Sequence, residues 1–293
     1  FALFEENEGT IKNLGIKLAK NSIQMSGLVG YNGNSAMIDD LENANIRASI
    51  DNCFCVLSDG SIAAAGLVGI NGGTIKNSYT SGKILSSAAE TLGGEPPLGI
   101  CAESYGGTIK NCYSLMLKED GSNIISPLID RISYNESTVK TTIENCYNPS
   151  GIIVGSIGGG ATVDIKNCYA LGNVTGVRGG IVGSSGDRYS NLTTITLDNC
   201  YFKGRIDYTT DYSSYDVDGL VGDRGDKVTI TNSKYLEKSL YLNGELQPDD
   251  ENAATEEEMN TYMKSVLEVV NGDGAIKEDT NNINNGYPLL QWQ

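Results

Sequence analysis

The feature that most constrains this chain is a short motif, Ile-x-Asn-(Cys/Ser)-Tyr, that recurs along most of its length. The clear copies begin at Ile75, Ile109, Ile143 and Ile165, a close variant begins at Leu197, and weaker copies lie at 11–15, 50–54 and 230–234. All eight copies carry the asparagine: Asn13, Asn52, Asn77, Asn111, Asn145, Asn167, Asn199 and Asn232. Internal self-similarity of this kind indicates a repeat architecture.

The spacing and composition of the repeats predict which architecture this is. A second motif, Gly-(Leu/Ile)-Val-Gly, lies at 27–30, 66–69, 180–183 and 219–222, with a near match at 152–155. Successive asparagines are 22 to 39 residues apart, and about 22 residues suffice for three short strands with their turns, which make one solenoid coil. Gly, Val, Ile, Thr and Tyr favour strands and turns over helix. We therefore predict an all-β protein, a right-handed parallel β-helix (β-solenoid) of about eight coils over residues 1–235.

Two columns of side chains follow from this prediction. At a bend the asparagines can adopt the left-handed conformation and hydrogen-bond from coil to coil as a ladder. The residue after seven of the eight asparagines is small, namely Cys53, Ser78, Cys112, Cys146, Cys168, Cys200 and Ser233. We expect these cysteines to be free thiols that fill the core. The pair Cys53 and Cys55 offers only two zinc ligands in a chain that has no histidine.

The residue before each ladder asparagine carries charges that alternate in sign along most of the column. In chain order these residues are Lys12, Asp51, Lys76, Lys110, Glu144, Lys166, Asp198 and Thr231. On an outward-facing strand each opposite pair contributes only about 0.2–1 kcal/mol, but the alternation avoids stacking like charges. We interpret this column as structural rather than catalytic.

The repeats resemble the GLUG motif family of bacterial surface and secreted proteins. The stretch from Gly66 to Tyr79 carries the resemblance best and reads Gly-Leu-Val-Gly-Ile-Asn-Gly-Gly-Thr-Ile-Lys-Asn-Ser-Tyr. The resemblance covers roughly residues 9–235, although the repeats around Leu98 and Pro127 lack the full glycine pattern. It implies a β-helical, extracellular, adhesin-like protein, and it implies location and architecture more than a defined activity.

Residues 236–293 differ from the repeats and are expected to form a C-terminal cap. Thr255 and Glu258 make a capping box, and apolar residues follow at helical spacing as far as Val270. This pattern predicts one amphipathic helix over about 255–271. Because an open terminal coil exposes its apolar core and its unpaired strand edges, we expect this segment to cover them.

The candidate binding site is an aromatic column that directly follows the small residues. It consists of Tyr79, Tyr113, Tyr147, Tyr169 and Tyr201, with Phe54 at one end. If the cysteines point inward, these rings face the other way, where stacked tyrosines suit recognition of a sugar or a protein. The alternative is that the rings pack beneath the turns.

Three further groups of residues are candidate sites. Asp211, Asp216 and Asp218 offer carboxylates for calcium, although a solvated acidic loop is the simpler interpretation. The tripeptide from Arg224 to Asp226 matches the Arg-Gly-Asp sequence of integrin ligands, which common residues also form by chance. A catalytic alternative would bring Arg178, Asp187 and Arg188 together on inserted loops.

Composition narrows the functions that this chain can have. The absence of histidine removes the usual general base of serine and cysteine hydrolases. The net charge of −16 opposes nucleic acids and anionic membranes, and no apolar run is long enough to cross a bilayer.

These observations combine into one expectation about function. We expect a monomeric, extracellular or cell-surface protein that is not an enzyme, needs no cofactor or metal, and binds a surface glycan or protein. The alternatives are a passive stalk and a β-helix polysaccharide lyase or glycoside hydrolase, which would need two convergent carboxylates or a base.

Overall fold

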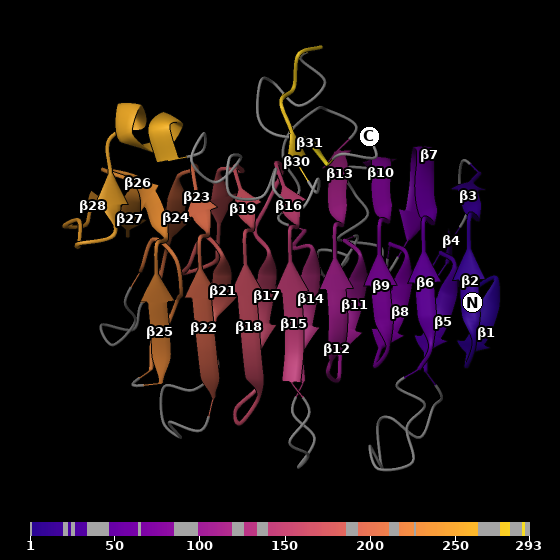
Figure 1. The fold of residues 1–293 in the computed structure, drawn as a ribbon. Coiled ribbons are helices and arrows are strands. Elements are labelled where there is room, and N and C mark those ends of the chain that lie inside the picture. The colour runs from indigo at the N-terminus through magenta and orange to yellow at the C-terminus, as the bar shows by residue number, and fades with distance from the viewer. Residues whose placement is uncertain are drawn as a thin grey trace.

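The computed structural model describes residues 2–19, 23–24, 27–33, 47–63, 66–84, 99–118, 126–133, 140–185, 193–210, 217–225, 227–262, 276–281 and 289–290. In these ranges the chain winds into a parallel β-helix whose coils follow one another along a single axis (Figure 1). The strands of one sheet rise in front while those of another descend behind as the chain advances, which makes the coil right-handed (Figure 1). The predicted fold class is confirmed.

Three long parallel sheets run along the axis (Figure 1). Sheet A contains β1 (Phe4–Asn7), β5 (Val29–Asn32), β8 (Val68–Asn71), β11 (Cys101–Ser104), β14 (Ile129–Ile132), β17 (Val154–Ile157) and β21 (Val182–Ser184). Sheet B contains β2 (Thr10–Lys12), β6 (Ser49–Asp51), β9 (Thr74–Lys76), β12 (Gly107–Lys110), β15 (Lys140–Glu144), β18 (Thr162–Lys166), β22 (Thr194–Asp198) and β25 (Val228–Thr231). Each coil therefore passes from sheet A through sheet B to the third sheet.

Sheet C is formed by the strands that begin at the aromatic column. It contains β3 (Gly15–Leu18), β7 (Phe54–Ala63), β10 (Tyr79–Ile84), β13 (Tyr113–Lys118), β16 (Tyr147–Asn148), β19 (Tyr169–Ala170), β23 (Tyr201–Phe202), β26 (Lys234–Leu236) and β29 (Ala253–Ala254), and β4 (Ile23–Gln24) pairs with β7. A shorter sheet D follows in the last coils, with β20 (Val174–Thr175), β24 (Ile206–Tyr208), β27 (Leu240–Leu242) and β28 (Glu245–Leu246). The strands β30 (Ile276–Lys277) and β31 (Leu289–Leu290) pair antiparallel.

The C-terminal helix begins where the capping box places it. The hydroxyl of Thr255 accepts from the backbone N–H of Glu258 at 3.2 Å, and the Glu258 carboxylate accepts from the N–H of Thr255 at 2.8 Å. Helix is described over residues 256–262, and residues 263–271 of the predicted helix lie outside the described residues. The expected boundary between residues 235 and 236 falls inside β26, so the solenoid sheets continue to β29.

The asparagine ladder is present, and its backbone explains the residue type. All eight ladder asparagines have φ between 47° and 57°, a left-handed conformation that asparagine tolerates better than most residues. Side-chain amides donate to the asparagine one coil back at five steps, for example from Asn145 to Asn111 at 3.1 Å. At the other two steps, Asn77 and Asn232 donate instead to Asp51 and Asp198.

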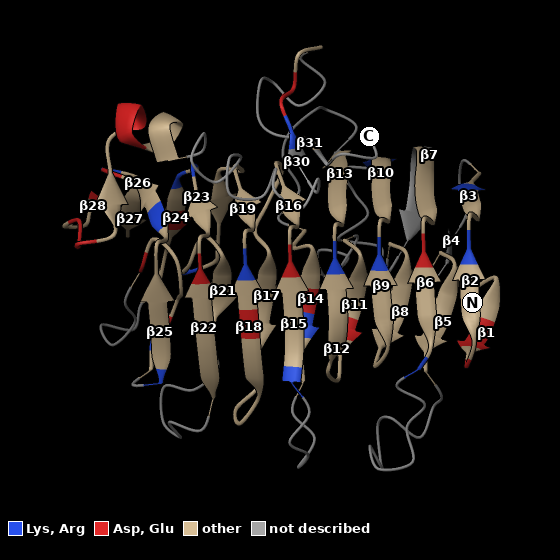
Figure 2. Ribbon diagram, viewed as in Figure 1, with Lys and Arg blue, Asp and Glu red and all other residues tan. Residues whose placement is uncertain are grey.

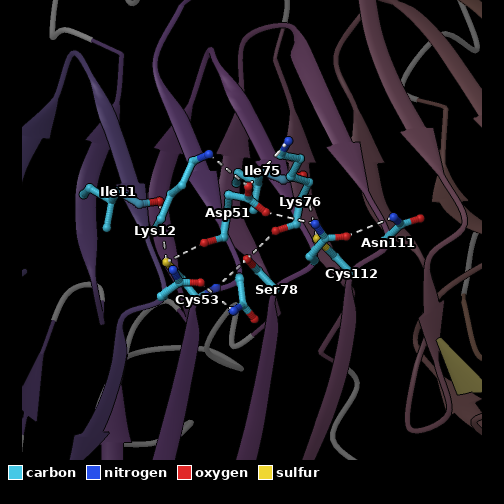
Figure 3. A network of polar contacts seen from close by, with 12 residues as sticks. Ile11, Lys12, Asp51, Cys53, Ile75, Lys76, Ser78, Asn111 and Cys112 are labelled. Carbon is cyan, nitrogen blue, oxygen red and sulfur yellow. Dashed lines mark hydrogen bonds and ion pairs between the residues drawn. The ribbon is translucent and has the colours of Figure 1, made fainter. Parts of the chain in front are cut away.

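The cysteine column lies inside the coil, as predicted. All seven cysteines are free and buried, and the thiol of Cys112 donates to the carbonyl of Lys110 at 3.2 Å. Ser78 makes the same contact with Lys76 at 2.7 Å, which explains why serine can replace cysteine in this column (Figure 3). Val, Ile and Leu side chains of sheets A and B complete one continuous core.

A second asparagine ladder runs inside the first coils and was not predicted. Asn7 donates to Asn32, and Asn32 donates to Asn71, each at 2.8 Å. All three side chains are buried, so these amides satisfy polar groups that would otherwise be desolvated without partners. The signal was available in the sequence, because an asparagine follows Gly-Leu-Val-Gly-x at positions 32 and 71.

The alternating charges lie on the outer face of sheet B, as predicted (Figure 2). Asp51 lies 3.6 Å from Lys12 and 3.5 Å from Lys76, and Lys110 lies 3.0 Å from Glu144. These are partly exposed pairs between neighbouring coils, and each contributes little to stability. The arrangement supports the structural interpretation of this column.

Candidate functional site

The predicted aromatic column exists, but it is not an exposed platform. Its rings stack from coil to coil with centroids 4.9 to 5.2 Å apart, and the tyrosine planes are nearly parallel. Tyr113, Tyr147, Tyr169 and Tyr201 are at most 6% exposed, while Tyr79 is half-buried. The candidate binding site predicted from the sequence is therefore closed to a ligand in this structure.

Part of this burial comes from a segment far away in the sequence. The rings do point away from the cysteine core, as strand alternation requires, and they form a separate apolar cluster. Met259 and Ala254 are buried in that cluster, and Tyr262 packs against it. The short helix and the strand before it therefore cover part of the column, so its rings serve as a second core.

The other predicted candidates are only partly described. The carboxylate of Asp218 accepts from the backbone N–H of Leu220 at 2.7 Å and of Val221 at 3.0 Å, so it shapes a turn. Burial raises the pKa of Asp218, and these two hydrogen bonds oppose the rise. Arg224 lies 3.9 Å from Asp218. Asp187, Arg188, Asp211, Asp216 and Asp226 lie outside the described residues.

A different set of side chains comes together on the outer face of sheet A. In the coils from β5 to β21 the strand buries its first residue and turns the third outward, whereas in β1 the first residue, Phe4, is exposed. The outward residue is Glu6 in β1, Tyr31 in β5 and Ile70 in β8, and it is polar in all later coils. Strand pairing and the contact of Ser184 with Asp223 place these polar residues in one line, which we call the sheet A strip: Glu103, Arg131, Ser156, Ser184 and Asp223.

One end of the strip is a cluster of hydrogen-bonding groups around Glu103. The hydroxyl of Ser133 donates to the Glu103 carboxylate. Burial raises the pKa of Tyr105, and the neighbouring Glu103 charge raises it further. Asp130 occupies the position that glycine holds in other coils, and burial raises its pKa against the opposing effect of Arg131.

The other end of the strip is closed by an ion pair. Arg178, from the segment after β20, pairs with Asp223 and also donates to the hydroxyl of Ser184 at 3.0 Å. Ser184 in turn donates to Asp223 at 3.1 Å. The guanidinium lies 5.6 Å from the ring centre of Tyr208. Since the side chains of Arg178 and Asp223 are only 15% and 5% exposed, this end forms a rigid wall.

Sequence reasoning missed the strip because no residue type repeats along it. The available signal was the position after the Gly-(Leu/Ile)-Val-Gly motif, which is apolar at Tyr31 and Ile70 and polar in all later coils. The pairing of Cys101 with both Val68 and Ile129 now fixes the register of those coils. Within the described part of the chain, no group of three or more His, Cys, Asp or Glu is placed to hold a metal.

Comparisons with known proteins support the fold. One solved structure, named as a putative immunoglobulin A1 protease from Bacteroides ovatus, matches with a TM-score of 0.57 and 19% identity, covering 94% of this chain and 88% of that chain. No family model and no curated protein matches the chain. Among the described residues, no helix is long and apolar enough to span a membrane.

The expectation that this chain is not an enzyme is contradicted by the comparison. The β-helix that suggested a binding scaffold is also the fold of a protein named as a protease. We therefore do not retain that expectation. At 19% identity the likeness shows the shared fold alone, and it assigns no catalytic residue to this chain.

Proposed function

We propose that this chain is part of an extracellular protein that binds an extended glycan along the sheet A strip. The observation that carries the proposal is the register of five polar outward residues in successive coils, from Glu103 to Asp223. At roughly 4.8 Å per strand, the four steps between them span about 19 Å. A ligand lying along the helix axis would meet one new polar side chain at every coil.

A glycan suits this face better than an extended peptide does. Peptides commonly bind to sheets by adding a strand to a free edge. The strands of sheet A from β5 to β17 are paired on both sides, so the strip presents side chains and no free backbone edge. Its hydroxyl, carboxylate and guanidinium groups match the hydrogen-bonding groups of sugars.

Three observations of different kinds support the extracellular location. The repeats resemble the GLUG family of surface and secreted proteins, and the chain shares its fold with a protein named as an immunoglobulin A1 protease, which is compatible with an extracellular role. Burial of all seven free thiols is also suited to an oxidising environment, because buried thiols react slowly. On this proposal, GLUG-like repeats form a scaffold whose sheet A face carries the ligand.

A glycan array with a blocking variant tests the proposal. Ser156→Trp places a large side chain in the middle of the strip, at a residue whose side chain makes no hydrogen bond to any described residue. Thr142→Trp is the matched control, because Thr142 is also half-buried but lies on the outer face of sheet B. We expect the blocking variant to lose at least about tenfold in affinity for any retained glycan and the control to lose little.

Two outcomes would overturn the proposal. Equal effects of the two tryptophans would place binding elsewhere, and failure of the wild-type protein to retain any glycan would favour a passive stalk. Immunoglobulin A1 should be included with and without its glycans, because the solved protein of similar fold is named for it. Electrophoresis of the same mixtures over time would detect any cleavage.

A further inference from the structure

Among the described residues, the side chains of the sheet A strip make hydrogen bonds at both ends of the strip but not in the middle. At one end Glu103 accepts from Ser133, and at the other end Ser184 is held by Arg178 and Asp223. Between these ends lie Arg131 on β14 and Ser156 on β17, which are paired in register on adjacent strands. The middle of the strip is therefore the part with hydrogen-bonding capacity to spare.

Arg131 and Ser156 make no side-chain hydrogen bond or ion pair with any described residue. Arg131 is exposed and Ser156 is half-buried, and both project from the same face of sheet A. Two carboxyl groups lie close to Arg131, yet neither forms an ion pair with it in the described part of the chain, since Glu103 accepts from Ser133 and Asp130 is partly buried. A guanidinium presents up to five N–H donors in a planar fork that fits a carboxylate.

The charge of the whole chain restricts the ligand further. A net charge of −16 repels a polymer with a carboxylate on every sugar, because long-range repulsion opposes each encounter. A single carboxylate on an otherwise neutral glycan avoids most of that repulsion and still reaches the guanidinium. The polar residues on either side, Glu103 and Ser184, would then face neutral sugar hydroxyls.

We propose that Arg131 and Ser156 form a subsite for the carboxylate of an acidic sugar within a mainly neutral glycan. This inference rests on the proposed function, and it names the chemical feature that the strip selects. The Arg131 guanidinium would donate two hydrogen bonds to the carboxylate, and the Ser156 hydroxyl would donate one from the neighbouring strand. Recognition would therefore centre on one charged group, with weaker contacts along the rest of the strip.

Nuclear magnetic resonance titration with small probes tests the subsite directly. The probes are methyl β-D-glucuronide, which carries one carboxylate, methyl β-D-glucoside, its neutral counterpart, and N-acetylglutamate, a carboxylate without a sugar. At millimolar concentrations we expect the glucuronide to shift the Arg131 side-chain Nε–H signal and the glucoside to leave it unchanged. Arg131→Gln should weaken glucuronide binding by about tenfold, and Ser156→Ala by a smaller factor.

Two controls separate recognition from net charge. Lys166→Gln removes an exposed positive charge from sheet B and should leave glucuronide binding unchanged. Arg131→Lys keeps the charge but loses the planar fork, so its affinity should fall between those of the wild type and Arg131→Gln.

The subsite is overturned if Arg131→Gln binds the glucuronide as the wild type does, or if the glucoside binds equally well. N-acetylglutamate binding as tightly as the glucuronide would overturn the assignment to a sugar. A different result is that the wild type prefers neutral glycans and that Ser156→Trp loses their binding. That result would refute this subsite and leave the proposed function standing.

Discussion

The side-chain amide of Asn77 donates to the carboxylate of Asp51 at 2.9 Å, and not to its ladder partner Asn52. The same carboxylate lies within 3.6 Å of Lys12 and Lys76 (Figure 3). Asp51 therefore connects three successive coils. At this step of the ladder, the asparagine side chain donates to an aspartate and not to the asparagine one coil back.

We expect the hydrogen bond to Asn77 to matter more than the two ion pairs of Asp51. Asp51→Ala removes the acceptor and should lower the free energy of unfolding by about 1–3 kcal/mol. Asp51→Asn keeps an acceptor oxygen and loses only the partly exposed ion pairs, so its cost should be about 1 kcal/mol or less. Urea unfolding of both variants measures this difference, and equal costs would show that the ion pairs dominate.

The ladder should depend on backbone conformation as well as on side-chain amides. Asn145 has a φ of 54°, donates to Asn111 at 3.1 Å and accepts from Asn167 at 3.0 Å. Asn145→Gly loses both hydrogen bonds but tolerates the left-handed backbone, whereas Asn145→Ala also carries a conformational cost of roughly 1–2 kcal/mol. The alanine variant should therefore unfold at a lower urea concentration than the glycine variant. The reverse order would mean that the amide contacts alone set the cost.

The seven thiols should be inert in the folded protein. Burial raises the pKa of Cys55 to about 12, and it also raises the pKa of Cys53. Because only the thiolate attacks a disulfide reagent, the native protein should react slowly at pH 8, while the protein in denaturant should react at all seven cysteines. Full labelling of the native protein within minutes would contradict the buried column.

The asparagine and cysteine columns beside the turn could be predicted from the sequence because each coil repeats the same local structural requirement. A left-handed bend favours asparagine, and a narrow interior favours a small side chain, so Asn145 and Cys146 recur as types in other coils. The direction of Tyr147 also followed from strand alternation. Its burial did not, because the residue that helps to cover the column, Met259, lies more than a hundred positions away.

The sheet A strip lay beyond sequence reasoning for a related reason. Arg131 and Ser156 belong together only because their strands pair in register, and the loops between coils differ in length. Local patterns report what one coil requires of its residues. They do not report which unlike residues of neighbouring coils share a face, and that information comes from the pairing of strands.

The cover over the tyrosine column should prevent the stacked rings from driving association. Met259 is fully buried against the stacked rings. Met259→Asp places a charge in that apolar cluster and should release the helix, which would expose the rings and promote association. Glu257→Ala, on the exposed side of the same helix, is the control. Light scattering and binding of a hydrophobic dye measure the effect, and a monomeric aspartate variant without dye binding would show that the helix is not a necessary cover.

Asp130 should make the protein less stable as the pH rises from acid toward neutral. Burial raises its pKa in the folded state, the Arg131 charge opposes this, and Glu103 adds to the rise. The folded protein therefore holds this proton more tightly than the unfolded chain, whose aspartates titrate near pH 3.9. Below that pH the carboxyl group is neutral in both states, and it contributes no penalty.

As the pH rises through the unfolded value toward the raised folded value, a destabilising contribution develops, and it is complete above the folded value. Asp130→Asn removes the titration while nearly preserving the shape of the side chain. The variant should match the wild type near pH 3 and exceed it in free energy of unfolding near pH 7, as measured by urea unfolding at a series of pH values. Arg131 must be retained in both proteins, because its charge partly offsets the cost of the ionised Asp130. A variant that is less stable than the wild type at pH 7 but equal to it at pH 3 would show that the carboxylate is stabilised in the folded state, contrary to the raised pKa.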